Sequence, residues 1–167
     1  MLAIRSMSRS LIFFALALTV AGLFMHGPAQ AAAPFSGLAG AWTGDGSIVL
    51  AKGSTERMRC DATYVVSQGG EKADLTLRCV SDSYHFDLNI GLVDTAGAVL
   101  GTWREPTQSV EGGISGTASG DRIQVTARGQ NFAAAINVAT RGAAQTAQIS
   151  APSGDLSRVA ITLHHAR

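Results

Sequence analysis

The fold is decided by the stretch from Arg57 to Val80, which reads RMRCDATYVVSQGGEKADLTLRCV. Its two halves alternate apolar and polar residues, and Gly69-Gly70 separates them. A two-residue loop at these glycines predicts a β-hairpin, because glycine supplies the positive φ that such turns need. Facing residues of this hairpin have numbers that add to 139, so Cys60 lies opposite Cys79.

Cys60 and Cys79 are the only cysteines in the chain. Redox-active pairs usually lie two residues apart at a helix N-terminus, whereas these lie in mid-strand on an apolar face. Facing residues of an antiparallel pair have Cα atoms within disulfide range. Counting from the glycines places the pair at a hydrogen-bonded position, with Cα atoms about 5.5 Å apart. The sequence therefore predicts a structural disulfide, which should stabilise the fold by about 3 kcal/mol.

From Ala41 onward, nearly every segment alternates apolar and polar residues, with turn residues about every 8–12 positions. This pattern predicts an all-β fold, an up-and-down antiparallel meander of about eight to ten strands. A meander of this length has two open edges, and closure into a small lipocalin-like barrel removes them. Residues 131–147 are rich in alanine and could form a short helix, but their fit to two paired strands argues against it.

Strand register offers a check on the meander, because a slip of one residue would turn the apolar set outward. Two-residue loops predict three facing apolar pairs: Ala118 with Ile123, Ala127 with Phe132, and Ile136 with Ala147.

The N-terminus has the pattern of a secretory signal peptide. Arg5 and Arg9 precede a mostly apolar run from Leu11 to Met25 and the small residues Ala29-Gln30-Ala31. The apolar run is shorter than the roughly twenty residues that a membrane-spanning helix needs. We predict a signal peptide at 1–31 cleaved after Ala31, an N-terminal extension at 32–40 and a single barrel domain at 41–167. The mature protein is expected to be periplasmic or secreted, without a membrane anchor.

Charge argues against nucleic acid as a partner. The chain has a formal net charge of +1, and removing residues 1–31 takes away two arginines and no acidic residue. The remaining chain is close to neutral and has no basic cluster in its sequence, so phosphate backbones and anionic membranes have nothing to bind by charge.

Catalytic and metal-binding patterns are weak. His164 and His165 are adjacent, so a regular strand points them to opposite faces, and His85 reads as a surface residue. The run Gly112–Gly116 contains Ser115 but lacks the G-x-S-x-G spacing of a nucleophile elbow. We therefore predict no catalytic residues, no metal, no cofactor and a non-enzymatic protein.

Aromatic residues on the inward rows are the candidate binding residues. Many other inward positions carry glycine or alanine, among them Gly44, Gly112 and Ala134. Small inward residues indicate either a cavity or a narrow, flattened barrel, and the sequence leaves both open. The candidate ligand-binding residues are Trp42, Tyr64, Phe86, Trp103 and Phe132.

Four short motifs carry a resemblance: Gly40–Gly44, Arg57-Met58-Arg59-Cys60 with Tyr64, Leu77-Arg78-Cys79 and Gly101–Trp103. Together they resemble a group of small, uncharacterised secreted bacterial β-barrel proteins, a likeness that brings no activity with it. The Gly-x-Trp start followed by a hairpin meander also resembles the lipocalin/calycin superfamily, which implies a pocket for a small ligand.

A second resemblance is to small periplasmic metalloprotease inhibitors, which are exported barrels with a Gly-x-Trp near the start and one disulfide. Their inhibitory N-terminal trunk would correspond to Ala32–Ser36. The leading hypothesis is an exported barrel that binds a small apolar or amphiphilic ligand. The alternative is a periplasmic or secreted protease inhibitor, or another module with a protein partner.

Overall fold

The computed structural model describes residues 33–151 and 156–166. The described residues belong to one compact unit, Ala31–Arg167. The predicted signal peptide at 1–31 lies outside the described residues. Within the described ranges, no helix is long and apolar enough to cross a membrane.

Ten antiparallel strands form a closed barrel in which each strand pairs with its neighbours in sequence, and β1 pairs with β10. The strands are β1 (Gly40–Leu50), β2 (Thr55–Ser67), β3 (Lys72–Val80), β4 (His85–Thr95), β5 (Ala98–Glu105), β6 (Val110–Ser119), β7 (Arg122–Gly129), β8 (Phe132–Arg141), β9 (Ala144–Ser150) and β10 (Leu156–His165). The predicted all-β meander and its closure into a barrel are confirmed. The alanine-rich residues 131–147 contribute β8 and most of β9, not a helix.

The cysteine hairpin is confirmed, with one correction. Cys60 faces Cys79 across β2 and β3, and the two form a disulfide. Their Cα atoms are 4.1 Å apart, close to the spacing of a non-hydrogen-bonded pair and shorter than predicted. The physical reason is the loop: pairing stops at Ser67–Lys72, which leaves a four-residue connection and moves the hydrogen-bond alternation by one residue. A disulfide of this kind is typical of the periplasm or the extracellular space.

The other predicted registers are correct in face but not always in partner. Ala118 pairs with Ile123 as predicted. Ala127 pairs with Ala134, and Ile136 pairs with Ile149, so these two predictions were wrong by two residues. The predicted pairs require loops at 129–130 and 141–142, whereas the loops fall at 130–131 and 142–143, each one residue later. A loop displaced by one residue shifts the partner by two, so every side chain keeps its face.

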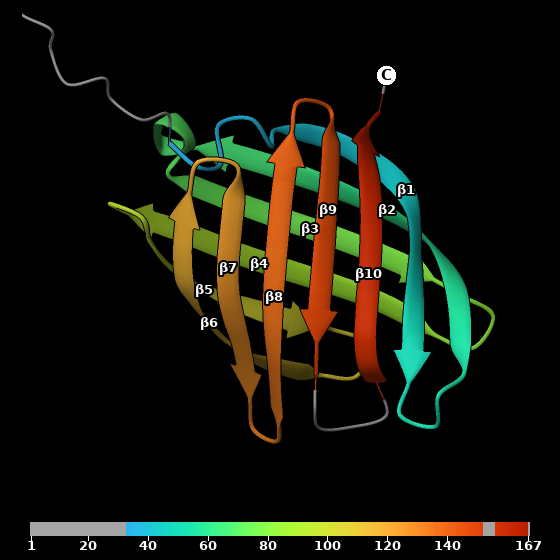
Figure 1. The fold of residues 1–167 in the computed structure, drawn as a ribbon. Coiled ribbons are helices and arrows are strands. Elements are labelled where there is room, and N and C mark those ends of the chain that lie inside the picture. Colours follow the sequence, from blue (N-terminus) through green and yellow to red (C-terminus); the bar gives the residue numbers. More distant parts are fainter. Residues whose placement is uncertain (1–32, 152–155, 167) are drawn as a thin grey trace, which may run out of the picture. The chain divides into compact units, whose positions relative to one another are not determined.

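Inward glycines allow neighbouring strands of the barrel wall to approach each other closely. Figure 1 shows β7–β10 in front of β2–β5, which cross behind them at a large angle, as in orthogonal sheet packing. A Cβ on Gly44 of β1 would overlap the carbonyl oxygen of Thr162, and one on Gly112 of β6 would overlap that of Arg128. These glycines let neighbouring strands approach closely where the wall turns, so they do not enlarge the interior.

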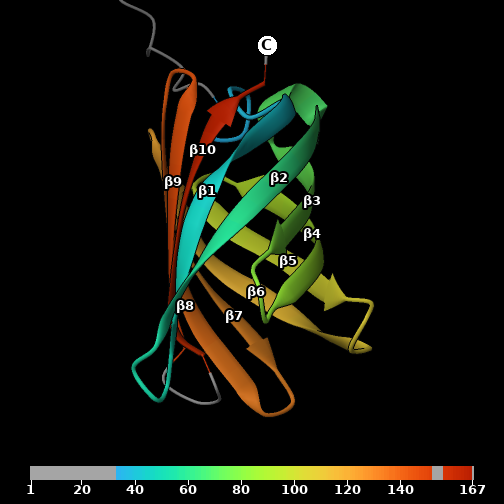
Figure 2. The same cartoon turned by 90° about the vertical axis from the view of Figure 1, so that its right-hand side faces the viewer.

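The barrel has two different ends, visible in Figures 1 and 2. One end, here called the terminal end, carries residues 33–39, the end of β10 and the 3-10 turn η1 (Gln68–Gly70). The opposite end, here called the loop end, carries the connections β1–β2, β3–β4, β5–β6 and β7–β8. An up-and-down meander places alternate connections at opposite ends, so this division follows from the topology.

Candidate functional site

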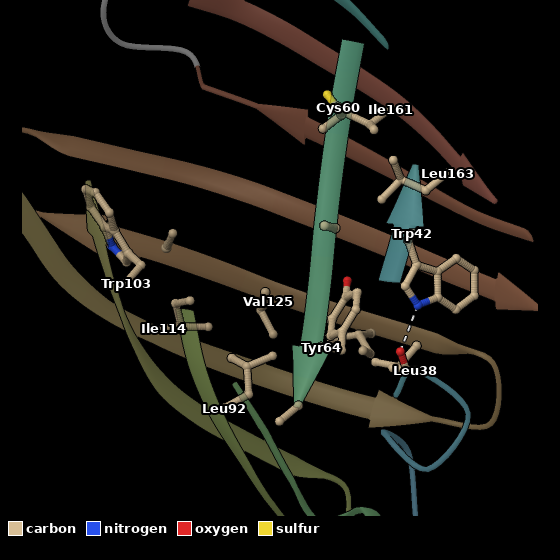
Figure 3. Packing of buried hydrophobic residues seen from close by; sticks show 14 of the residues in the cluster. Leu38, Trp42, Cys60, Tyr64, Leu92, Trp103, Ile114, Val125, Ile161 and Leu163 are labelled. Carbon is tan, nitrogen blue, oxygen red and sulfur yellow. Dashed lines mark hydrogen bonds between the residues drawn. The ribbon is translucent and has the colours of Figure 1, made fainter. Parts of the chain in front are cut away.

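Residues 33–39 close the terminal end. Phe35 and Leu38 are fully buried in the core, and the Phe35 amide donates a hydrogen bond to the Gly70 carbonyl at 3.1 Å. The indole Nε1 of Trp42 donates to the Leu38 carbonyl at 2.8 Å, which fixes the segment over the barrel (Figure 3). Trp42 thus has its single polar atom satisfied by the chain itself.

Tyr64 lies beside Trp42, with ring centroids 6.5 Å apart in an edge-to-face arrangement. Its hydroxyl donates to Oε1 of Gln145 at 2.9 Å, and Nε2 of Gln145 donates to the Thr140 hydroxyl at 3.1 Å. Burial raises the pKa of Tyr64 to about 12. The phenol therefore stays neutral and holds β2 to β9 through Gln145, which is itself buried.

This burial predicts a loss of stability in alkali. The unfolded phenol ionises near pH 10, whereas the folded one keeps its proton to about pH 12. Between these values the unfolded state binds fewer protons, so the free energy of unfolding falls as pH rises, by roughly 2–3 kcal/mol in all. Urea unfolding across this range should show the fall in the wild type and in Tyr84→Phe, which leaves Tyr64 intact. Tyr64→Phe should lose it; a fall of the same size in Tyr64→Phe would show that other groups cause it.

Trp103 lies along the inner wall toward the loop end. Its indole passes over Gly112 and Gly129, where a Cβ would come within 2.7 and 3.1 Å of the ring, and its Nε1 donates to the Arg128 carbonyl at 3.2 Å. The ring reaches Phe132 on β8, with centroids 5.5 Å apart. Phe132 remains 37% exposed, so this aromatic pair faces solvent on one side.

The five predicted ligand-binding residues fall into three groups. Trp42 and Tyr64 lie together at the terminal end, and Trp103 lies apart from them (Figure 3). Trp103 pairs instead with Phe132. Phe86 stacks on Tyr84 with centroids 6.1 Å apart, at the loop end of β4. The sequence did not separate these groups, because alternation reports which face a residue occupies but not its depth in the barrel.

The interior is packed unevenly. Many inward side chains are fully buried, whereas other inward apolar residues are only partly buried, and several of these lie toward the loop end. These partly buried side chains leave apolar surface uncovered in the part of the interior nearest the loop end. We call it the loop-end interior; its partly buried side chains include Leu50, Leu77, Phe86, Leu88, Ile136, Ile149 and Val159.

Two carboxylates at the loop end are engaged by neighbouring loops. Glu56 accepts hydrogen bonds from the Ser81 hydroxyl at 2.8 Å and the Ser83 amide at 3.2 Å, and the first of these chiefly lowers its pKa. Glu105 is buried, which by itself would raise its pKa, but bonds from Thr107, the Gln108 amide and the Asp87 amide outweigh this and lower it. Both groups hold loops in place.

Two hollows mark the outer surface of the wall. One, of about 590 Å³, crosses β3–β6 between outward polar residues that include Asp74, Asn89 and Arg104. The other, of about 420 Å³, crosses β7–β10 and includes Arg128 and Arg158. Both lie on the outer face of the sheet, so neither is the loop-end interior.

Sequence reasoning missed the role of residues 33–39. It predicted an N-terminal extension at 32–40 and assigned no structure to it. Phe35 and Leu38 are its two large apolar residues, and their spacing of three was the signal available. Sequence reasoning also missed Gln145, a buried polar residue of β9. Its partner Tyr64 lies far away in the sequence, so no local pattern marks the pair.

No protein-family model matches the sequence, and no curated protein matches it. Solved structures do share the fold. The crystal structure of Rv2717c from M. tuberculosis matches with a TM-score of 0.60 at 18% identity, over 79% of this chain and 94% of that one. The S-type phycobiliprotein lyase CPES from Guillardia theta matches with a TM-score of 0.55 at 14% identity, over 80% of this chain and 90% of that one. At these identities the likeness shows the fold alone, a lipocalin-like antiparallel barrel.

Proposed function

We propose that the protein binds a small apolar ligand in the loop-end interior. The observation that carries this proposal is the set of inward apolar side chains that remain partly exposed inside a closed barrel. Leaving apolar side chains in contact with water costs about 25 cal/mol per Å², and a ligand that covers them recovers this free energy. Ligand sites in proteins of this size are mostly apolar and concave.

Within this site, Phe86, Trp103 and Phe132 are proposed as the aromatic walls that contact the ligand. Trp42 and Tyr64 are proposed to act as the closed floor, since both already pack against protein and both polar atoms are satisfied. The ligand enters from the loop end, because residues 33–39 cover the other end. A neutral or weakly polar ligand fits best, since Glu56 and Glu105 are already bound to loops.

Binding is favoured over catalysis. One of the two similar structures is a phycobiliprotein lyase, so the fold by itself does not separate a binding protein from an enzyme. In the described part of the loop-end interior, the carboxylates of Glu56 and Glu105 accept hydrogen bonds from loop residues and so are engaged in holding the loops rather than free to act as general acids or bases. The likeness to a lyase is also compatible with a bound small molecule.

The inhibitor alternative draws less support from the same region. Ala33 and Ser36 pack around Gly70, where a side chain would come within 3.0 Å of both. Phe35 is buried in the core. A trunk that enters a protease active site must be free to leave its own barrel, whereas this segment closes it.

A neutral fluorescent probe, N-phenylnaphthylamine, tests the proposal. Ala147 faces inward and is partly buried, so Ala147→Phe should fill the site and weaken probe binding by about tenfold or more. Gln148→Phe places the same ring on the outer face and is the matched control, with binding within about twofold of wild type. Circular dichroism and urea unfolding establish that both variants are folded. Equal binding by both variants would contradict an interior site.

A further inference from the structure

Charge is divided unequally between the two halves of the barrel. From residue 122 to the end, the sequence holds five arginines and a single acidic residue, Asp155. The described part of this stretch contains β7–β10, which lie side by side in Figure 1. Although the net charge of the whole chain is close to zero, this face carries arginines and no lysine.

The arginines of this face are not equivalent. Arg122 and Arg141 lie at the terminal end and share Asp121, with N–O distances of 3.8 and 3.2 Å. Arg128 and Arg158 lie toward the loop end and are exposed. Across residues 33–151 and 156–166, neither of these two forms an ion pair. The described face thus has one pair of arginines that share a single carboxylate and one pair with no ion-pair partner among the described residues.

Strand register brings Arg128 and Arg158 to one hollow. Arg128 pairs with Ala133, whereas Arg158 pairs with Ser150, which in turn pairs with Ala135. The alanines carry too little side chain to fill the space between the arginines, and a hollow of about 420 Å³ results. The hydroxyls of Thr126 and Ser150 line the same hollow.

We propose that this hollow binds a tetrahedral oxyanion, a phosphate or sulfate group, between Arg128 and Arg158. Guanidinium groups present planar pairs of N–H donors that match such oxygens, and charge-assisted hydrogen bonds are the stronger kind. The hydroxyls supply further donors, and the alanine floor leaves room for a small ester substituent. A single group is bound, not a nucleic acid, because the other two arginines of the sheet already share Asp121.

Arginine side-chain NMR tests the site directly. Inorganic phosphate and sulfate are titrated into the ¹⁵N-labelled full chain, with ionic strength held constant by sodium chloride. The Nε–Hε signals of Arg128 and Arg158 should shift and saturate, whereas those of Arg104 and Arg122 should not. Shifts that grow linearly and equally at all arginines would reduce the effect to general screening and overturn the proposal.

Variants sharpen this result. Arg128→Gln keeps the backbone carbonyl that Trp103 uses, so the fold is retained. It and Arg158→Gln should each weaken phosphate binding by about tenfold. The matched control, Arg122→Gln, lies on the same sheet but at the ion-paired end and should change binding by less than about twofold. Full affinity in both test variants would overturn the site.

Two further probes distinguish a soluble phosphate ester from a lipid headgroup as the source of the oxyanion. Glycerol phosphate represents a free phosphate ester, and phosphatidylcholine vesicles with added phosphatidic acid represent a lipid headgroup. Binding of glycerol phosphate without flotation on the vesicles assigns a soluble ester. Flotation that is lost in Arg128→Gln and Arg158→Gln assigns the headgroup, and flotation that survives both substitutions overturns a role for this hollow at membranes.

Discussion

Gly112→Ala is expected to destabilise the barrel by about 3 kcal/mol or more, a large effect for a single methyl group. The added Cβ would overlap the backbone carbonyl of Arg128 on β7 and press on the indole of Trp103, and backbone cannot move aside as a flexible side chain can. Its neighbour Gly113 faces outward with nothing within 4 Å of a new Cβ. Gly113→Ala is therefore the matched control and should change stability by less than about 0.5 kcal/mol.

Urea unfolding of both variants measures this difference, provided that the slopes match the wild type. The difference in stability between the two variants shows whether Gly112 allows close contact between strands or leaves free space in the interior. Equal stability of Gly112→Ala and Gly113→Ala would mean that the interior at Gly112 has spare room, and that the wall does not depend on close strand contact there.

Loss of the Cys60–Cys79 disulfide is expected to cost about 3 kcal/mol of unfolding free energy. The bond closes a loop with a sequence separation of 19 residues, and its absence leaves the unfolded chain with more conformations. The double substitution Cys60→Ala with Cys79→Ala should lower the urea midpoint accordingly. Cys60 faces Gly44 on β1, and Cys79 faces Phe86 on β4. Both pairings should persist in the double variant, because the meander itself sets the strand register.

Reductant supplies the control for this prediction. Wild-type protein in excess dithiothreitol should lose stability toward the level of the double variant, whereas the variant should not respond. A wild type that keeps its stability when mass spectrometry shows both thiols reduced would contradict the expected contribution. A variant that responds to reductant would indicate an effect unrelated to the disulfide.

Much of the fold could be predicted because the information is local. Period-two alternation placed each inward row, and loop glycines placed most connections within one residue. The predictions that were wrong, for strand partners and for the length of the cysteine hairpin loop, depend on backbone geometry that no local sequence pattern marks. Gln68 has a φ of 52°, an unusual value for a non-glycine residue, and it helps to lengthen the loop beyond Gly69-Gly70.

The candidate site was harder to predict, because depth and proximity depend on how strands tilt around the barrel. Inward glycines looked like a cavity signal, yet Gly112 and Gly129 make room for the Trp103 indole. Arg128 and Arg158 are far apart in sequence, and the register of four strands brings both to one hollow. The count of charges along the sequence could not show that these two arginines lie at the same hollow.

The most direct test of an apolar site inside the barrel is an isotope-edited NMR experiment. Methyl-labelled protein is mixed with unlabelled N-phenylnaphthylamine, and nuclear Overhauser effects from protein methyls to the probe are recorded. Inward methyls of Leu77, Leu88 and Ile149 should give cross-peaks, and the exposed outward methyls of Val93 and Leu100 should give none. Cross-peaks from Val93 and Leu100 alone would place the probe on the outer surface and contradict binding in the loop-end interior.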